Sequence, residues 1–150
     1  MARLDDQRNF LWKRLVERYP FAGFSCSLET NDGGMFGVLW DYDNHYVVDG
    51  EIAVPPDSIV RLDAEGNVLW CNPYPQLLLP GPEPRKVNVT ALLPAPDGGV
   101  LVIGQNWDVD GLKFLRLDGN GAVLADWRLE IGIPIDYAEA FTAGGQGYLV

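Results

Sequence analysis

The side chains best suited to chemistry gather in one stretch of the chain, LWDYDNHYVVDGEIAVPPDS at positions 39–58. It holds four Asp, one Glu, the only His of the chain, one Trp and two Tyr. Such side chains serve three kinds of chemistry. Carboxylate oxygens bind calcium, a His beside an acid transfers protons, and aromatic rings within a charged rim bind proteins.

A metal loop is the first interpretation of this stretch. An EF-hand needs oxygen ligands at its first, third and fifth positions, Gly at the sixth and Glu at the twelfth. Counting from Asp41 places His45 fifth, Tyr46 sixth and Ile52 twelfth, so the motif fails. One His and two distant Cys do not suit zinc either. We expect no metal and no cofactor, with one alternative left open, a different calcium site built from Asp41, Asp43, Asp49 and Glu51.

Catalysis is the second interpretation. His45 lies between Asp43 and Asp49, so an acid could orient it as a base. A nucleophile is missing, because none of the serines stands in a Gly-x-Ser-x-Gly motif. We therefore expect no catalytic residues. A hydrolase or carbohydrate-binding domain that uses the same carboxylates and aromatic rings remains the alternative.

Protein recognition is the third interpretation and fits the residue types best. Aromatic rings supply contact area at small entropic cost, and an acidic rim orients a basic partner. The pattern Trp-Asp-x-Asp occurs at residues 40–43 and again at 107–110. The sequence thus predicts a partner-binding surface, made of Trp40, Asp41, Tyr42, Asp43, His45, Tyr46, Asp49, Glu51, Trp107, Asp108 and Asp110.

The charge of the chain supports a basic partner. The net charge is −10, and residues 1–18 carry +2, which leaves −12 for the remainder. Between Glu29 and Glu65 nine acids face a single base, Arg61. Such a field attracts basic proteins and repels nucleic acid and anionic lipid. We therefore expect a non-catalytic protein-binding module, an inhibitor or immunity-type protein that masks a basic partner.

The remaining sequence indicates the compartment. No apolar run reaches the roughly 20 residues of a membrane span, and the N-terminus lacks the apolar segment of a signal peptide. We expect a cytoplasmic protein that binds no membrane. Cys26 and Cys71 are too few for a disulfide scaffold and are expected to be buried, reduced thiols.

The elements that position these residues begin with a predicted helix. In DDQRNFLWKRLVERYP, Asp5 or Asp6 can cap a helix and Pro20 blocks its continuation. Apolar residues follow the helical period on one side, with basic residues largely on the other. The pattern predicts an amphipathic α-helix over 5–19 that lies across a sheet.

After Pro20 the period changes to two and the sequence repeats. LETNDGGMFGVLW (28–40) matches LPAPDGGVLVIGQNW (93–107), and IVRLDAEGNVLW (59–70) matches FLRLDGNGAVLADW (114–127). Gly-containing turns between alternating apolar segments indicate hairpins. We predict a mainly β, single domain over 1–150, with four antiparallel strands in each of two repeats, 22–72 and 86–130, and a partial repeat over 135–150.

The two repeats differ in length at one place. Asp32 and Asp63 are 31 residues apart, whereas Asp97 and Asp118 are 21 apart. The first repeat therefore has ten extra residues between its second and third strands, inside the acidic stretch. Insertions in repeat proteins map to loops, and the face that carries them often binds partners.

The segment RLDAEGNVLW resembles the turn between the third and fourth strands of β-propeller blades, particularly the quinoprotein-like and arylsulfotransferase-like repeats. The resemblance covers about two and a half units and carries over no catalytic or cofactor-binding residue. Because propellers close with roughly four to eight blades, it implies a further alternative, a structural part-propeller that self-assembles into a homo-oligomer.

A Pro-rich connector, NPYPQLLLPGPEPR, joins the two repeats over residues 72–85. Its three leucines, Leu77, Leu78 and Leu79, suit either a plug for the core or an exposed docking patch. We favour the plug.

Overall fold

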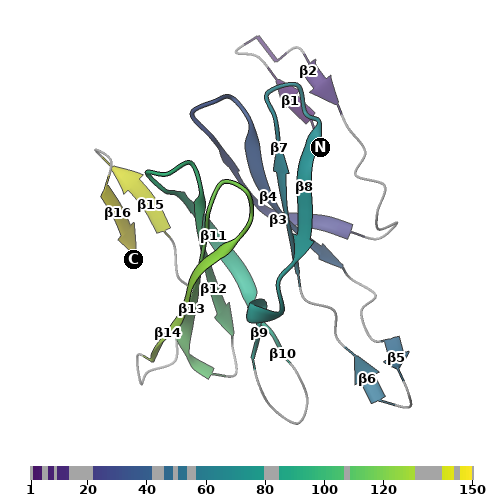
Figure 1. Ribbon diagram of the computed structural model, residues 1–150, viewed down its shortest axis with the longest axis vertical. Helices are drawn as coiled ribbons and strands as arrows, with labels where there is room; N and C mark the ends of the chain where they lie inside the picture. The colour runs from purple at the N-terminus through teal and green to yellow at the C-terminus, as the bar shows by residue number, and fades with distance from the viewer. Residues whose placement is uncertain are drawn as a thin grey trace.

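Two four-stranded antiparallel sheets form most of the part of the chain that the structure describes (Figure 1). The computed structural model describes residues 2–4, 7–8, 10–13, 22–41, 46–48, 51–53, 57–79, 85–106, 109–130, 140–143 and 146–149. The first sheet has the order β3 (Ala22–Glu29), β4 (Met35–Asp41), β7 (Ser58–Leu62) and β8 (Val68–Pro73). The second sheet has the order β11 (Asn88–Pro94), β12 (Val100–Asn106), β13 (Val109–Leu117) and β14 (Val123–Glu130). The expected mainly β class with four-stranded antiparallel sheets is confirmed.

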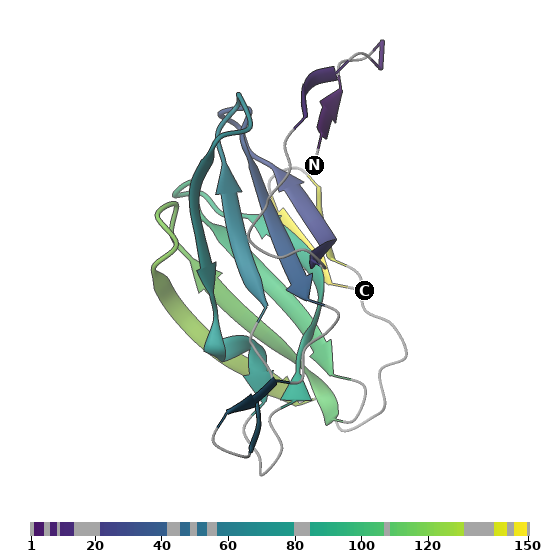
Figure 2. The ribbon, with the colours of Figure 1, turned by 90° about the vertical axis from the view of Figure 1, so that its right-hand side faces the viewer.

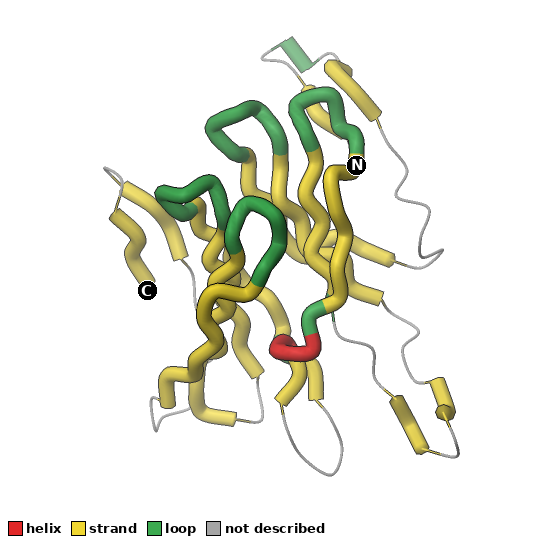
Figure 3. The backbone as a smooth tube through the Cα atoms, viewed as in Figure 1, coloured by secondary structure: helices red, strands yellow, loops and turns green. Residues whose placement is uncertain are grey.

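Within the described residues, four short hairpins accompany the two sheets (Figure 3). They are β1 (Ala2–Leu4) with β2 (Phe10–Lys13), β5 (Tyr46–Val48) with β6 (Glu51–Ala53), β9 (Leu78–Leu79) with β10 (Arg85–Lys86), and β15 (Ala140–Ala143) with β16 (Gln146–Leu149). A 3-10 turn, η1 (Pro75–Leu77), precedes β9. Within the described ranges no helical segment has both the length and the apolar character needed to cross a lipid bilayer.

The expected N-terminal helix over 5–19 is wrong where that range is described. Phe10–Lys13 forms strand β2, which pairs antiparallel with β1 through Arg3 opposite Trp12 and Leu4 opposite Phe10. Three consecutive apolar residues at 10–12 fit a short strand as well as a helix, and the partner strand decides between them. Residues 14–19 lie outside the described residues.

The Asp-Gly-Gly turns have the same geometry in both sheets. Gly33 and Gly98, the first glycines, have φ angles of 79° and 78°, which residues with a β-carbon rarely adopt. In each turn the Asp carboxylate accepts a hydrogen bond from the amide of the second glycine, at 3.1 Å. The turn residues thus hold β3 to β4, and β11 to β12, in register.

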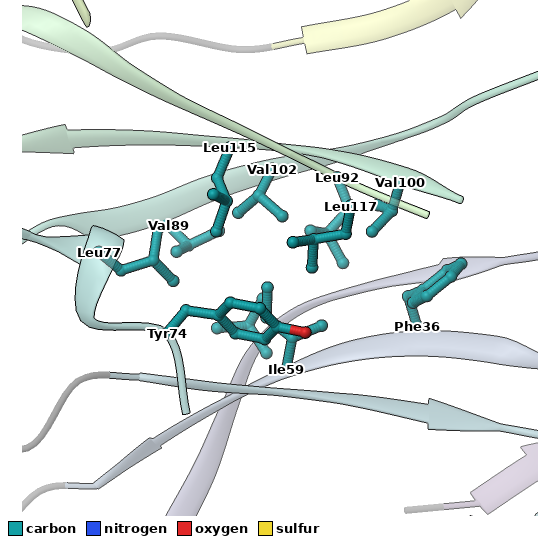
Figure 4. Packing of buried hydrophobic residues seen from close by; sticks show 11 residues of the cluster. Phe36, Ile59, Tyr74, Leu77, Val89, Leu92, Val100, Val102, Leu115 and Leu117 are labelled. Carbon is teal, nitrogen blue, oxygen red and sulfur yellow. The ribbon is translucent and has the colours of Figure 1, made fainter. Parts of the chain in front are cut away.

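The two sheets pack face to face around one shared core. Figure 4 shows Leu115, Val102 and other residues of the second sheet pointing toward Ile59 of the first. The 3-10 turn closes one end of this core, because Leu77 is 1% exposed and belongs to the same cluster. Leu77 therefore acts as the expected plug, while Leu78 and Leu79 are half-buried.

The two sheets stack head to tail, which means that the face of one sheet packs against the opposite, non-equivalent face of the other. Arg61 lies opposite Phe36 in the first sheet, and Arg116 lies opposite Leu101 at the matching position of the second. Phe36 packs in the shared core, whereas Leu101 packs against a separate cluster on the far side of its sheet. Equivalent faces of the two sheets therefore point in the same direction along the stack.

The first strands of successive sheets lie together. β11 contacts both β3 and β15. In Figure 2, β3 and β15 lie toward the right of the view, whereas the last strands, β8 and β14, lie toward the left. In each sheet the first strand, β3 or β11, therefore lies beside the first strand of the neighbouring sheet, and the later strands lie progressively farther from that contact.

Candidate partner-binding surface

The predicted surface residues lie near two places in the sequence, the end of β4 with the acidic stretch after it and the start of β13. Trp40 and Asp41 end β4, while Tyr46 and Glu51 begin β5 and β6. Asp110 belongs to β13. For these five residues only the course of the backbone is described. The other predicted residues lie outside the described residues: Tyr42, Asp43, His45, Asp49, Trp107 and Asp108.

The acidic stretch contains a hairpin of its own. Between β4 and β7 the chain forms β5 and β6, which pair antiparallel with Tyr46 opposite Ala53 and Val48 opposite Glu51. This hairpin extends away from the end of the first sheet (Figure 1). In the second sheet β12 ends at Asn106 and β13 begins at Val109, so the two sheets differ here most. The ten extra residues fall in this segment.

A buried arginine holds the first hairpin turn. The Arg61 guanidinium, 5% exposed, donates to Asp32 at 2.6 Å and to the Leu62 carbonyl at 2.5 Å. It also lies over the Phe36 ring, 4.8 Å from the ring centre, as a cation–π contact. Sequence analysis did not assign this role to Arg61, although an Arg-Leu-Asp triplet in each repeat was a usable signal.

The second sheet repeats this arrangement. Arg116 donates to the Asp97 carboxylate and to the Leu117 carbonyl. The second glycine of each turn, Gly34 or Gly99, lies where a β-carbon would approach the arginine closer than 3.0 Å. The Asp-Gly-Gly and Arg-Leu-Asp motifs are therefore two halves of one structural contact.

These turn carboxylates stay ionised. Hydrogen bonds from Thr30, then Arg61, hold the pKa of Asp32 far below its ordinary value. A hydrogen bond from Arg116 lowers the pKa of Asp97 in the same way. A carboxyl with a lowered pKa is a poor proton donor at neutral pH, so these acids serve the fold rather than acid catalysis.

The two cysteines are free thiols, both half-buried. Desolvation raises the pKa of Cys26 to about 11, so its thiol is protonated at neutral pH and a weak nucleophile. Among the described residues no group of three or more His, Cys, Asp or Glu side chains is placed to hold a metal ion.

Exposed apolar side chains lie on the outermost strand of each sheet, which sequence analysis did not single out. Val68 and Leu69 lie at the start of β8, and Val123, Leu124, Trp127 and Leu129 lie on β14. All six side chains are at least 40% exposed. The sequence feature that could have indicated these exposed side chains is the apolar segment after each Arg-Leu-Asp triplet.

The comparisons with known proteins give the fold and no function. No family model and no curated protein matches the chain. The crystal structure of a protein of unknown function from Bacteroides caccae is similar, with a TM-score of 0.53, 16% sequence identity and 89% of this chain covered. The chain spans 38% of the length of that protein, and at this identity the likeness concerns the fold alone.

Proposed function

We propose that this chain is a non-catalytic protein-binding module of the inhibitor or immunity type, which masks a basic partner. The observation that carries the proposal is the hairpin β5–β6. It interrupts an otherwise matching pair of sheets, extends away from the first sheet (Figure 1), and occupies the most acidic part of the chain.

For the scaffold, we propose that the sheets are blades of the propeller type. Three features support this. The two sheets have the same strand order, they stack head to tail, and the first strand β11 contacts both β3 and β15. Blades of a propeller are four-stranded sheets arranged in this way around a central line.

The proposed binding element uses the charge of the insertion. Asp41, Asp43, Asp49 and Glu51 give it four carboxylates, with Trp40 and the tyrosines as anchors. Such an acidic rim raises the association rate with a basic partner, and the gain falls as salt rises. The carboxylates of Asp32 and Asp97, in the Asp-Gly-Gly turns, already pair with arginines.

The test has two stages. In a chain that lacks residues 44–53, Asp32 and Asp63 are as far apart in sequence as Asp97 and Asp118, and such changes in loop length cost little stability. We expect the full chain, but not the shortened chain, to retain a stoichiometric basic protein from native lysate. Equal recovery by both chains would contradict the proposal.

The second stage measures association kinetics with the recovered protein. We expect the pair Asp41→Asn and Asp43→Asn to lower the association rate about tenfold and to weaken its salt dependence. The control pair Glu29→Gln and Glu65→Gln changes the net charge equally outside the insertion and should have a smaller effect. Equal effects of the two pairs would assign binding to net charge and reject the insertion as the site.

A further inference from the structure

β14 has the properties of a strand that pairs with another strand. It runs for eight residues, Val123–Glu130, all of them exposed, and forms the outer edge of the second sheet. It pairs with β13 on one side, and no other described strand pairs with it. An unpaired edge offers a row of backbone N–H and C=O groups to a new strand.

The apolar exposure of β14 extends over both faces of the sheet. Val123, 40% exposed, lies opposite Leu117, whose side chain belongs to the core between the sheets. Trp127, 42% exposed, lies opposite Phe114 and stacks on it, with ring centres 5.2 Å apart. Phe114 belongs to the cluster on the other face. A sheet stacked on one face would cover either Val123 or Trp127, whereas a strand added at the edge would contact both side chains.

The equivalent edge of the first sheet is less suitable. β8 also exposes apolar side chains, Val68 and Leu69, but it is shorter and ends in Asn72 and Pro73. Proline has no N–H to donate to a neighbouring strand, and asparagine is depleted in strands. Added pairing is therefore favoured at β14.

The charges of β14 select the partner strand. We propose that two copies of this chain associate through β14, which pairs antiparallel with itself about a two-fold axis at Trp127. In a symmetric antiparallel pair one residue lies opposite its own copy, and its neighbours pair across the axis. An axis at Trp127 places Asp126 opposite Arg128, and Ala125 opposite Leu129, so opposite charges and apolar side chains meet.

The neighbouring registers bring like charges together. An axis at Asp126 places two Asp carboxylates opposite each other, and an axis at Arg128 places two guanidinium groups opposite each other. The latter also sets Asp126 against Glu130. Like charges directly opposite each other destabilise a strand pair. The charge order of β14 thus favours the axis at Trp127 and a second copy as the occupant.

The first test compares the mass of the full chain with that of charge variants by sedimentation equilibrium. We expect a dimer for the natural chain, and at least a tenfold higher dissociation constant for Arg128→Asp, because two Asp then face each other. The double variant Asp126→Arg with Arg128→Asp exchanges the charges and should restore the dimer. It also keeps an acid near Lys113, which pairs with Asp126 in the natural chain. The control Arg8→Asp makes the same charge change at an exposed residue outside β14.

The second test measures the register directly by cross-linking under a mild oxidant, in a chain with Cys26 and Cys71 replaced by Ala. We expect Trp127→Cys to form an intermolecular disulfide, and Leu129→Cys alone not to form one. Because loss of the Trp ring could weaken the dimer, the pair Ala125→Cys with Leu129→Cys provides a second version that keeps Trp127, and it should cross-link efficiently. A monomeric natural chain, a double charge variant that stays monomeric, or equal cross-linking by the Trp127 and Leu129 variants would overturn the proposal. These outcomes do not depend on the β5–β6 hairpin.

Discussion

At the scale of single residues, each Asp-Gly-Gly turn assigns a different task to each of its three positions. The Asp accepts hydrogen bonds from the turn and from an arginine two strands away in the order of the sheet. The first glycine supplies a positive φ, and the second leaves room for the arginine. The two glycines are thus required for different reasons, and substitutions can separate them.

We predict that Gly99→Ala destabilises the protein more than Gly98→Ala. A β-carbon at Gly99 would meet the Leu117 carbonyl and the Arg116 guanidinium closer than 3.0 Å, and such overpacking costs about 3 kcal/mol. At Gly98 nothing lies within 4 Å, so only the positive φ opposes alanine, at about 1 kcal/mol. Urea unfolding measures both values, and equal losses would reject the distinction.

We predict that the stabilising effect of Asp32 is lost in acid. Its folded-state pKa is lowered by hydrogen bonds from Thr30 and Arg61, so the unfolded chain binds the proton more readily. The free energy of unfolding of the natural chain should exceed that of Asp32→Asn by a constant amount above about pH 4. Because Asp32 is 65% exposed, that amount is about 1 kcal/mol or less.

Below about pH 4 the difference between the two chains should shrink, because Asp32 takes up a proton in the unfolded chain while it stays ionised in the folded chain. Urea unfolding at a series of pH values measures the difference, with Glu65→Gln as the control at an exposed acid. A difference that stays constant down to pH 2 would contradict the assigned role of Asp32.

At the scale of elements, the end of β8 links the first sheet to the second. The Trp70 indole donates to the Gly119 carbonyl at 3.0 Å, and the Tyr74 hydroxyl donates to the Gly121 carbonyl at 2.7 Å. Both acceptors belong to the turn between β13 and β14. Trp70 within β8 and Tyr74 just after it thus fix the position of a turn in the neighbouring sheet.

We predict that Tyr74→Phe lowers the free energy of unfolding by about 1 kcal/mol. Tyr74 is 3% exposed, and without its hydroxyl the Gly121 carbonyl loses a donor in a buried position. The ring and its packing stay the same, so the change removes only the hydrogen bonds of the hydroxyl, to Gly121 and to the Asn72 side chain. Thermal and urea unfolding should agree on the loss, and an unchanged stability would mean that water replaces the hydroxyl without cost.

The sequence predicted correctly those elements that depend on residues close together in the chain. Turn residues such as Gly98 indicate a hairpin through their own conformational preference. The alternation of apolar and polar residues then indicates a strand on either side of the turn. The N-terminal helix over 5–19 failed, because whether Phe10–Lys13 becomes a strand depends on pairing with Ala2–Leu4, which local periodicity does not encode. The role of Arg61 was missed for a similar reason, since Asp32 lies 29 residues away.

For the candidate surface, too, local features could be predicted from the sequence and long-range ones could not. Comparison of the two repeats located the insertion between the second and third strands from residue counts alone, and the structure has β5–β6 there. The exposed edge at β14 requires knowledge of which strand is outermost. An apolar strand such as VLADWRLE has the same pattern whether or not a neighbour covers it.

At the scale of the whole molecule, the largest hydrophobic cluster is shared between the two sheets, and each sheet has a smaller cluster of its own. Ile59 in the first sheet and Leu115 in the second are both 0% exposed and belong to the same cluster (Figure 4). Separation of the sheets would expose both sets of side chains together. A large part of the free energy that stabilises each sheet therefore depends on the other sheet.

We predict that the two sheets unfold in a single transition. Ile59→Ala and Leu115→Ala should each lower the free energy of unfolding by about 3 kcal/mol, since each leaves a cavity in the shared core. The control Leu124→Ala, at a side chain 56% exposed, should change it by less than about 0.5 kcal/mol. In all variants, urea curves followed by tryptophan fluorescence and by far-ultraviolet circular dichroism should coincide. If Leu115→Ala instead split the curve into two steps, with part of the strand signal retained in the first, the sheets would be separate folding units and the shared core would contribute little to their cohesion.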